Sequence, residues 1–547
     1  ILIMSRTRIV GGKITEIVGG EYNIYSEGPI TLTSLEGSVN ITARQGITHG
    51  NPGTAPTVES GKIEAKCIVH FRPKKDWKGE EYGCDWMRIE DTALITGGSN
   101  IFGDTNYEKI IVKQYKEAAF TNLVTDSNFN AGFYKTDPGL FNKLKAAYKY
   151  HTITWKNKKD SSGNEIKDSQ NNPIKEDYFC TWISLYPKEI TKKIPQGKGK
   201  PPLIEKRATN YSNTKATLSL IVDIEEEPEI LRFEENKNFL ITPMEIDVKG
   251  KGRGKHALID HLTIECIDEF TSDQTITLNA ITKTTNANGT VIEEKKLAGK
   301  LLVWKNKQRK KAKVVLVAVK TPQLNVSNGI QIGNNANQQA LFEKYLHQAL
   351  IDVKVANEIL DMSTEPELQA GGKYVTQDSN KNNKNVLKCY YKPMQNTTTN
   401  TLMISTHQPA RFEDLEKFLR KKLSDKLKAI NPRDEHKYDN HFIAFYFGED
   451  GGYMDTSNAY KGLNGYSSGK NVMLFAGKND QTAAHEFLHS FKLPHTFANK
   501  EADANAKFTF EYTKTENLLD YSHMLNPPQE RYTLWQWQWI IANGSIT

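Results

Sequence analysis

The sequence predicts a multidomain chain that is mostly β-rich and ends in an α+β domain. At 547 residues the chain is too long for a single hydrophobic core, and about three or four domains are expected. From residue 8 to about residue 320, apolar and polar residues alternate in short runs, which is typical of strands. From about residue 338 onward, apolar residues also recur with helical spacing, so helices and strands are both expected there.

The first 55 residues differ from the rest of the chain in their pattern of apolar, polar and glycine residues. Short alternating runs, such as Gly28–Ser34 and Gly37–Ala43, are divided by glycines. We interpret residues 1–55 as a β-prism segment of stacked strands; an ordinary two-hairpin meander has the same composition. So short a segment buries too little core to stand alone, and we expect a prism that trimerises or stacks on a partner.

Two β-rich ranges follow a linker at 51–57 that contains proline and glycine. Residues 61–225 hold several strand-like runs and a polar insert at 156–176, which we interpret as a long hairpin loop. Residues 226–322 hold strands about every 10–15 residues, which favours an immunoglobulin-like β-sandwich. Neither range shows a catalytic constellation, so we interpret both as structural spacing modules.

A connector rich in glycine and asparagine leads into the C-terminal domain, which we place at 338–547. Trp535 and Trp539 lie one turn apart in its last helix and are predicted to pack in the core. The other predicted elements, in chain order, are a helix from 339, a strand at 351–355, a helix at 411–430, strands at 440–448 and 471–477, and the closing helix at 534–541.

Composition and charge are those of an ordinary soluble chain, with a net charge of +7 and 38% hydrophobic residues. The basic run Lys305–Lys311 is predicted to be a solvated loop or strand end, and no nucleic-acid partner is expected. Five widely spaced cysteines predict no disulfide framework. No run is long enough to span a membrane, and the first residues lack the apolar region of a signal peptide. We therefore expect synthesis in the cytoplasm without a cleavable signal.

The most informative stretch has the pattern H-E-x-x-H-x-x-K-x-x-H and begins at His485. On a helix, His485 and His489 share one face, so both imidazoles can reach one metal ion. Pro494 marks where that helix must have ended, and a chain that turns back there can bring His495 to the same ion. Three ligands with Glu486 beside them match the open site of a catalytic zinc, where the glutamate deprotonates a zinc-bound water.

The opposite face of this helix is apolar. A buried helix that carries two histidines and a glutamate on its other face is costly unless those groups have partners. The alternative is an amphipathic helix with solvated histidines, and the spacing of the third histidine favours the metal site. The apolar residues recur at i, i+3, i+4 and i+7: Ala484, Phe487, Leu488 and Phe491.

This stretch resembles the metzincin clan of zinc metallopeptidases, whose pattern is H-E-x-x-H-x-x-G-x-x-H, and Leu493–Phe497 resembles the pappalysin-type branch. The resemblance implies a zincin-like fold. Lys492 replaces the glycine that lets the chain turn, and a non-glycine residue in the left-handed conformation costs roughly 1–2 kcal/mol. By position, the implied site residues are three zinc ligands, His485, His489 and His495, and a general base, Glu486.

Downstream, Glu516–Ser522 resembles the Met-turn, N-x-M-D-Y, which forms an apolar floor under the metal. Leu519 stands in place of the methionine, a nearly volume-conserving exchange. Tyr521 matches the family tyrosine that stabilises the oxyanion, and the alternative is a packing residue. His523 is predicted to lie on the surface. The resemblance also implies that the strand at 471–477 is an edge strand that binds substrate backbone by β-augmentation.

The glycine-divided runs of residues 1–55 resemble the β-prism tail of the VgrG spike proteins of bacterial type VI secretion systems. The resemblance implies docking on a VgrG-like spike trimer and secretion or injection into target cells. The combined prediction is a zinc metalloendopeptidase effector that acts on a protein or peptide. Two alternatives remain: a spike-tip or carrier protein with a vestigial metallopeptidase domain, and a surface adhesin built of β-modules.

Overall fold

The computed structural model contains two compact units, Ile1–Ile63 and Glu64–Thr547, and the described residues all belong to the second. The predicted β-prism segment at 1–55 lies outside the described residues. The structure describes residues 65–89, 106–114, 134–160, 163–196, 200–285, 291–389, 395–396, 401–402, 413–454, 460–498 and 503–546.

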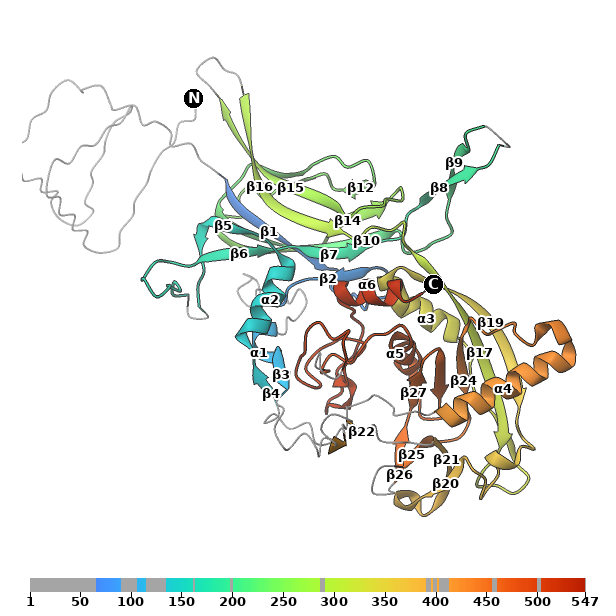
Figure 1. Cartoon of the computed structure of the whole chain (residues 1–547). Coiled ribbons are helices and arrows are strands. Elements are labelled where there is room, and N and C mark those ends of the chain that lie inside the picture. Colours follow the sequence, from blue (N-terminus) through green and yellow to red (C-terminus); the bar gives the residue numbers. More distant parts are fainter. Residues whose placement is uncertain are drawn as a thin grey trace, which may run out of the picture. The chain divides into compact units, whose positions relative to one another are not determined.

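Two β-sheets pack face to face in the first part of the second unit (Figure 1). Neighbouring strands are antiparallel, except that β7 and β16 run parallel. The first sheet has the order β1 (Lys66–Pro73), β10 (Lys215–Glu226), β14 (Gly254–Cys266) and β12 (Phe239–Thr242). The second has the order β13 (Glu245–Ile246), β11 (Ile230–Phe233), β15 (Gln274–Thr285), β16 (Val291–Val303), β7 (Thr181–Ser184) and β2 (Gly83–Asp85).

Both sheets draw strands from the two ranges that were predicted to be separate, 61–225 and 226–322. Their inner faces share one core, in which Phe71, Leu220 and Leu278 are fully buried. The boundary predicted at 225 falls inside β10, which pairs with β1 on one side and β14 on the other. The chain therefore builds one sandwich from both ranges, because strands far apart in sequence complete each sheet.

Smaller elements flank the sandwich, and they fill the connections between its strands. The polar insert predicted as a hairpin loop joins two paired strands, β5 and β6, as expected. These elements are α1 (Tyr107–Ile110), β3 (Val112–Gln114), β4 (Tyr134–Thr136), α2 (Pro138–Tyr148), β5 (Lys149–Asn157), β6 (Lys175–Phe179), β8 (Glu189–Ile194) and β9 (Leu203–Ala208).

A third sheet forms the centre of the C-terminal part, and its longest strand is β17 (Lys310–Pro322). The sequence prediction assigned residues 310–322 to the sandwich. They instead pair in parallel with β19 and β24, in the interior of the helix-covered sheet. Three strands pair with β17: β18 (Ile330–Ile332), β19 (Ile351–Asp361) and β24 (Phe442–Tyr446). Beyond β24 the order continues with β28 (Asn471–Leu474) and then β27 (Gly465–Ser468).

Helices cover both faces of this third sheet. Val314 and Leu316 of β17 pack in one core with helices α3 (Gln338–Leu346) and α5 (Asp480–Ser490). The residues between them point to the other face, where α4 (Glu413–Ile430) packs, and Figure 1 shows α4 crossing that face. A strand buried on both faces reads as a continuous apolar run, which explains why β17 resembles a sandwich strand in the sequence.

The closing helix α6 (Gln536–Gly544) lies between the sandwich and the third sheet (Figure 1). Trp535 and Trp539 are buried there, as predicted from their spacing. The remaining elements are the sheet β20 (Val375–Asp378), β21 (Lys384–Cys389), β25 (Gly451–Met454) and β26 (Tyr460–Leu463), the pair β22 (Gln395–Asn396) and β23 (Thr401–Leu402), and the 3-10 turns at His347–Ala349, Pro366–Leu368, Ser379–Lys381, Pro432–Asp434 and Ser522–Met524.

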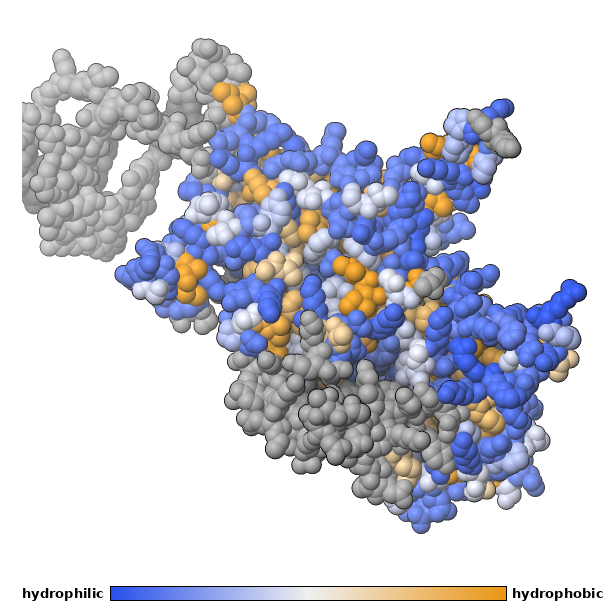
Figure 2. Space-filling model, viewed as in Figure 1, coloured by the Kyte–Doolittle hydropathy of each residue, from blue (hydrophilic) through white to orange (hydrophobic). Residues whose placement is uncertain are grey.

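On the face shown in Figure 2, most of the coloured residues are hydrophilic, and hydrophobic residues form small separate patches. Within the described residues, no helix has the length and apolar character needed to cross a membrane. All five cysteines are buried, and none is paired in a disulfide.

Candidate metal centre

The helix that carries the histidine motif, α5, is anchored at its start and along its apolar face. The Asn479 side chain accepts hydrogen bonds from the backbone N–H groups of Gln481 and Thr482, which satisfies two free donors of the first turn. Phe487 is fully buried and packs edge-on against Phe342 of α3, with ring centroids 4.5 Å apart. The opposite face of α5 is thereby held in a fixed orientation.

The end of α5 is a tight turn that reverses the chain. The Leu493 N–H donates to the Leu488 carbonyl at 3.0 Å and the Lys492 N–H to the His489 carbonyl at 2.9 Å, the two bonds of a Schellman cap. Lys492 has φ = 67°, so this lysine adopts the left-handed conformation that a glycine favours. The exchange of glycine for lysine therefore leaves the turn in place.

The turn brings three imidazoles together. The Nε2 atom of His489 lies 3.1 Å from Nε2 of His485 and 3.1 Å from Nε2 of His495. One nitrogen from each ring lies within 4.8 Å of the other two, so a single metal ion can be bound. The structure thus gathers all three predicted ligands from two segments, the last turns of α5 and the chain after it.

Backbone carbonyls fix which ring nitrogen is free to bind. Nδ1 of His485 lies 2.7 Å from the Leu518 carbonyl oxygen, and Nδ1 of His489 lies 2.7 Å from the Leu493 carbonyl oxygen. A carbonyl can only accept, so in both rings Nδ1 carries the hydrogen and Nε2 keeps its lone pair. Burial, with His489 and Arg531 nearby, lowers the pKa of His485 far below its ordinary value. The neutral imidazole that results is the form that binds metals.

Glu486 is buried with 9% of its surface exposed. Burial raises its pKa to about 8, although the positive charge of Arg531 acts in the opposite direction. Among the described residues, no hydrogen bond or ion pair to the Glu486 carboxyl is found. A pKa in this range suits a group that takes up and returns a proton near neutral pH.

The turn at residues 515–521 is organised around Asp520, a buried carboxyl. Asp520 accepts hydrogen bonds from the backbone N–H groups of Thr513, Thr515 and Tyr521, and from the Thr515 hydroxyl. Burial raises the pKa of Asp520 to about 6, and these hydrogen bonds oppose the rise. The turn directs the Leu518 carbonyl to His485 and buries Leu519 completely, so the expected apolar residue is in place.

Aromatic rings surround the histidines on one side. The Tyr521 ring centroid lies 5.0 Å from that of His495 and 5.8 Å from that of His485. Phe497 stacks on His495 at 4.8 Å and lies 5.4 Å from Tyr521. Tyr521 is therefore adjacent to the metal site, which agrees with both its predicted catalytic role and the packing alternative.

Two features of this site differ from the sequence expectation. His523, predicted on the surface, is half-buried beside Tyr521, where burial lowers its pKa to about 4. Arg531 was not predicted: its Nη1 donates to the Asp520 carbonyl at 2.8 Å and lies 3.5 Å from Nδ1 of His485. No motif surrounds Arg531, so only the folded chain brings it to the histidines.

The edge of the third sheet also differs from the expectation. The segment expected to be the edge strand contains β28, which is paired on both sides, with β24 and with β27. The outer position belongs to β27, antiparallel to β28, and its Ser467 hydroxyl contacts the Ser490 hydroxyl at the end of α5 at 2.8 Å. The sequence of β27 contains Gly465 and two serines, which gives a weak strand signal.

Comparison with known proteins finds no matching family model, no matching curated protein and no matching solved structure. The site therefore has to be interpreted from its own geometry. Three neutral imidazole nitrogens suit Zn²⁺ and also other first-row ions, so the donor set fits zinc but does not select it.

Proposed function

We propose that this chain is a zinc-dependent peptidase that cleaves peptide bonds in a protein or peptide substrate. The observation that carries the proposal is the convergence of three Nε2 atoms, one of them from His485, whose neighbour in the helix is the buried Glu486. Two of the three imidazoles have their Nδ1 hydrogens held by backbone carbonyls, which is the usual support of a metal-binding histidine.

Zinc, when bound by these histidines, supplies a Lewis acid that lowers the pKa of water towards ~7 and polarises a substrate carbonyl. Glu486 takes the proton from the attacking water and returns it to the nitrogen of the leaving amine. The new C–O bond forms first and gives a tetrahedral intermediate, and the peptide C–N bond then breaks as the leaving nitrogen takes up the proton. With an ion held by the histidines, the Glu486 carboxyl would have a lower pKa than in the metal-free chain, which would favour the carboxylate form that accepts the proton.

The groups beside the histidines have separate roles in this proposal. The Tyr521 ring lies next to that of His495, and in this proposal its hydroxyl donates to the oxyanion of the tetrahedral intermediate. The outer strand β27 offers backbone groups for an extended substrate peptide, by β-augmentation. The helix-covered sheet with an antiparallel outer strand, and the turn at 515–521, support the zincin-like interpretation.

Delivery is the second element of the proposal. Residues 1–55 resemble a VgrG-like spike segment, and we propose that they dock the chain on a spike trimer that carries it out of the producing cell. Two departures from the family pattern count slightly towards the alternative, a carrier with a vestigial metallopeptidase domain, and the intact histidines and Glu486 count against it more. Lys492 adopts the required left-handed turn and Leu519 is buried, so neither departure disrupts the site.

The direct test is Glu486→Gln. Losing a general base typically lowers a rate ~10²–10⁴-fold, whereas zinc affinity stays close to native because Glu486 is not among the three ligands. Cleavage of an unfolded protein substrate, followed by mass spectrometry, and zinc content would be measured together on the full chain. Native protein that binds zinc but cleaves no peptide bond, or a variant as active as the native chain, would overturn the proposal.

A further inference from the structure

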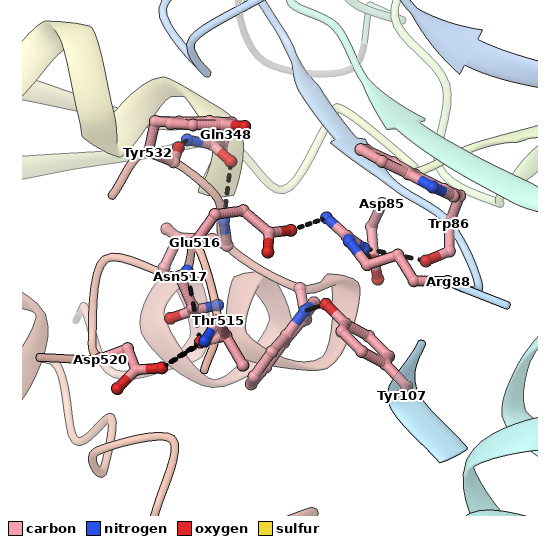
Figure 3. A network of polar contacts seen from close by, with 12 residues as sticks. Asp85, Trp86, Arg88, Tyr107, Gln348, Thr515, Glu516, Asn517, Asp520 and Tyr532 are labelled. Atoms are coloured by element: carbon pink, nitrogen blue, oxygen red, sulfur yellow. Dashed lines mark hydrogen bonds and ion pairs between the residues drawn. The ribbon is translucent and has the colours of Figure 1, made fainter. Parts of the chain in front are cut away.

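The sandwich contacts the metal centre through a buried ion pair. Nη2 of Arg88, which follows β2, lies 2.6 Å from Oε1 of Glu516, at the start of the turn under the histidines. Arg88 is 1% exposed. Figure 3 shows the Glu516 carboxyl pointing across to the guanidinium from the C-terminal part of the chain. A charge pair removed from water to this extent requires good partners on both sides.

Those partners are present around Arg88. Its Nη1 donates to the Trp86 carbonyl at 2.9 Å and lies 3.4 Å from the Asp85 carboxyl. The guanidinium also lies over the Trp86 ring, 3.8 Å from its centroid. Burial opposes the charge of Arg88, but the negative charge of Glu516, with smaller contributions nearby, raises its pKa above the ordinary value. Arg88 is therefore a fixed cation whose position the sandwich determines.

Glu516 is connected to the first histidine through a short stretch of backbone. Its carbonyl accepts from the backbone N–H groups of Tyr532 and Thr533, and the Leu518 N–H donates to the Thr533 carbonyl at 2.9 Å. The next group along is the Leu518 carbonyl, which accepts from Nδ1 of His485. A shift of Glu516 therefore moves the acceptor that orients a metal ligand.

A second contact reaches the third histidine independently. Beside α1, the Val112 N–H donates to the Thr509 carbonyl, and the Glu511 N–H donates to the Ile110 carbonyl, each at 2.9 Å. The residue between them, Phe510, donates its N–H to the carbonyl of Thr496, which directly follows His495. Segments from the first quarter of the chain thus support both sides of the histidine cluster.

We infer that Arg88 is a positioning residue for the metal site, acting through Glu516 and the Leu518 carbonyl on His485. The inference rests on the proposed function, because the three histidines must bind a metal ion. It also changes the interpretation of the β-sandwich, which was expected to be a spacer. On this inference the sandwich is a structural part of the metal centre, and the segment 338–547 alone lacks one of its supports.

The test measures zinc affinity in full-length variants. Glu516→Gln keeps the size and an acceptor oxygen but removes the charge, and it should weaken zinc binding ~10-fold, at the lower end of the effect of a group that orients a ligand. Arg88→Gln should weaken it at least as much, and Arg88→Lys should restore part of the loss by keeping the charge. The double variant Arg88→Gln with Glu516→Gln should lose less than the product of the single losses, since both act through one pair.

The control is Lys156→Gln, which breaks a part-buried ion pair between the flanking strand β5 and Asp223 of the sandwich strand β10. It should leave zinc affinity unchanged even if it lowers the unfolding temperature. Competition with a chromophoric chelator gives the dissociation constants, and circular dichroism confirms that each variant is folded. If Arg88→Gln does not fold, Glu516→Gln and Arg88→Lys decide the question.

The outcomes separate this inference from the proposed function. Native affinity in folded Glu516→Gln, or a loss in Lys156→Gln as large as that in Glu516→Gln, would overturn the positioning role while leaving the zinc peptidase in place. A native chain that binds no zinc would overturn both.

Discussion

Nδ1 of His485 and the carbonyl oxygen of Leu518 lie 2.7 Å apart, and this contact joins helix α5 to the turn at 515–521. This hydrogen bond fixes the tautomer of the imidazole and the plane of its ring. The turn at 515–521 therefore orients the His485 imidazole, in addition to placing the apolar Leu519 beneath the histidines. The consequences for binding, acidity and catalysis can be tested separately.

His489 lies at the centre of the histidine cluster, since its Nε2 faces those of both other histidines. His489→Ala should therefore reduce bound zinc from about one ion per chain to a small fraction, because two imidazoles leave the coordination incomplete. Elemental analysis of protein dialysed against a limiting zinc buffer measures the content. His436→Ala, at a histidine whose side chain is 78% exposed, is the control and should retain the metal. Zinc retention by both variants would contradict the assignment.

The protonation of Glu486 predicts how the stability of the metal-free protein depends on pH. Its pKa is about 8 in the folded chain against an ordinary value of 4.5, so the folded state binds the proton more tightly. This contribution to stability is complete below about pH 4.5 and is lost as the pH rises to about 8, with a slope of up to ~1.4 kcal/mol per pH unit. Glu486→Gln has no such group.

The free energy of unfolding of native and Glu486→Gln proteins would be measured in urea with a chelator at pH 5, 6, 7 and 8. The native protein should lose stability relative to the variant as the pH increases. Histidine titration affects both proteins and cancels in the difference. Parallel profiles across this range would show that Glu486 is not the buried group described here.

The left-handed turn at Lys492 predicts a stabilising substitution. Lys492 is exposed and has φ = 67°, so Lys492→Gly removes backbone strain without removing a buried contact. Strain relief of roughly 1–2 kcal/mol is partly offset by the greater freedom of glycine in the unfolded chain, leaving a gain of up to ~1 kcal/mol. Chemical denaturation measures the gain, and Lys492→Ala, which keeps a Cβ atom, should not show it. Zinc affinity should stay native in both.

Tyr521→Phe separates the two interpretations of this tyrosine. Phenylalanine keeps the ring beside His495, so a packing role predicts unchanged cleavage. A role in stabilising the oxyanion predicts a kcat lower by ~10²–10³-fold with zinc content unchanged. Steady-state kinetics on a cleavable peptide gives kcat and KM separately. Equal activity in the native and variant proteins would assign Tyr521 to packing.

The local parts of the site could be predicted from the sequence, because their signals are local. His485 and His489 are one helical turn apart, and His495 follows through a turn that the residues after α5 form by themselves. The same is true of α4, since the helix predicted at 411–430 ends at residue 430 in the structure as well. Spacing along one element is sufficient for such predictions.

The non-local parts could not be predicted. Arg531 reaches His485 from 46 residues away, and no pattern in the sequence links the two. The strands of the sandwich pair across long separations in sequence, as β1 does with β10. Dividing the sequence at residue 225 therefore could not predict that the two ranges share one core. β17 was misassigned because an apolar run gives the same signal in a sandwich and in a helix-covered sheet.

The contact between Asp85 and the start of α6 has a consequence for the timing of assembly. The Gln536 N–H donates to the Asp85 carboxyl across a separation of 451 residues. The early part of a chain emerges from the ribosome first, so β2 and Arg88 are exposed long before Glu516 and Gln536 exist. During that interval the charges of Asp85 and Arg88 remain in water and the histidine helix has not been made. The support that Arg88 gives to Glu516 and that Asp85 gives to the start of α6 is thus complete only in a chain whose synthesis has passed residue 536.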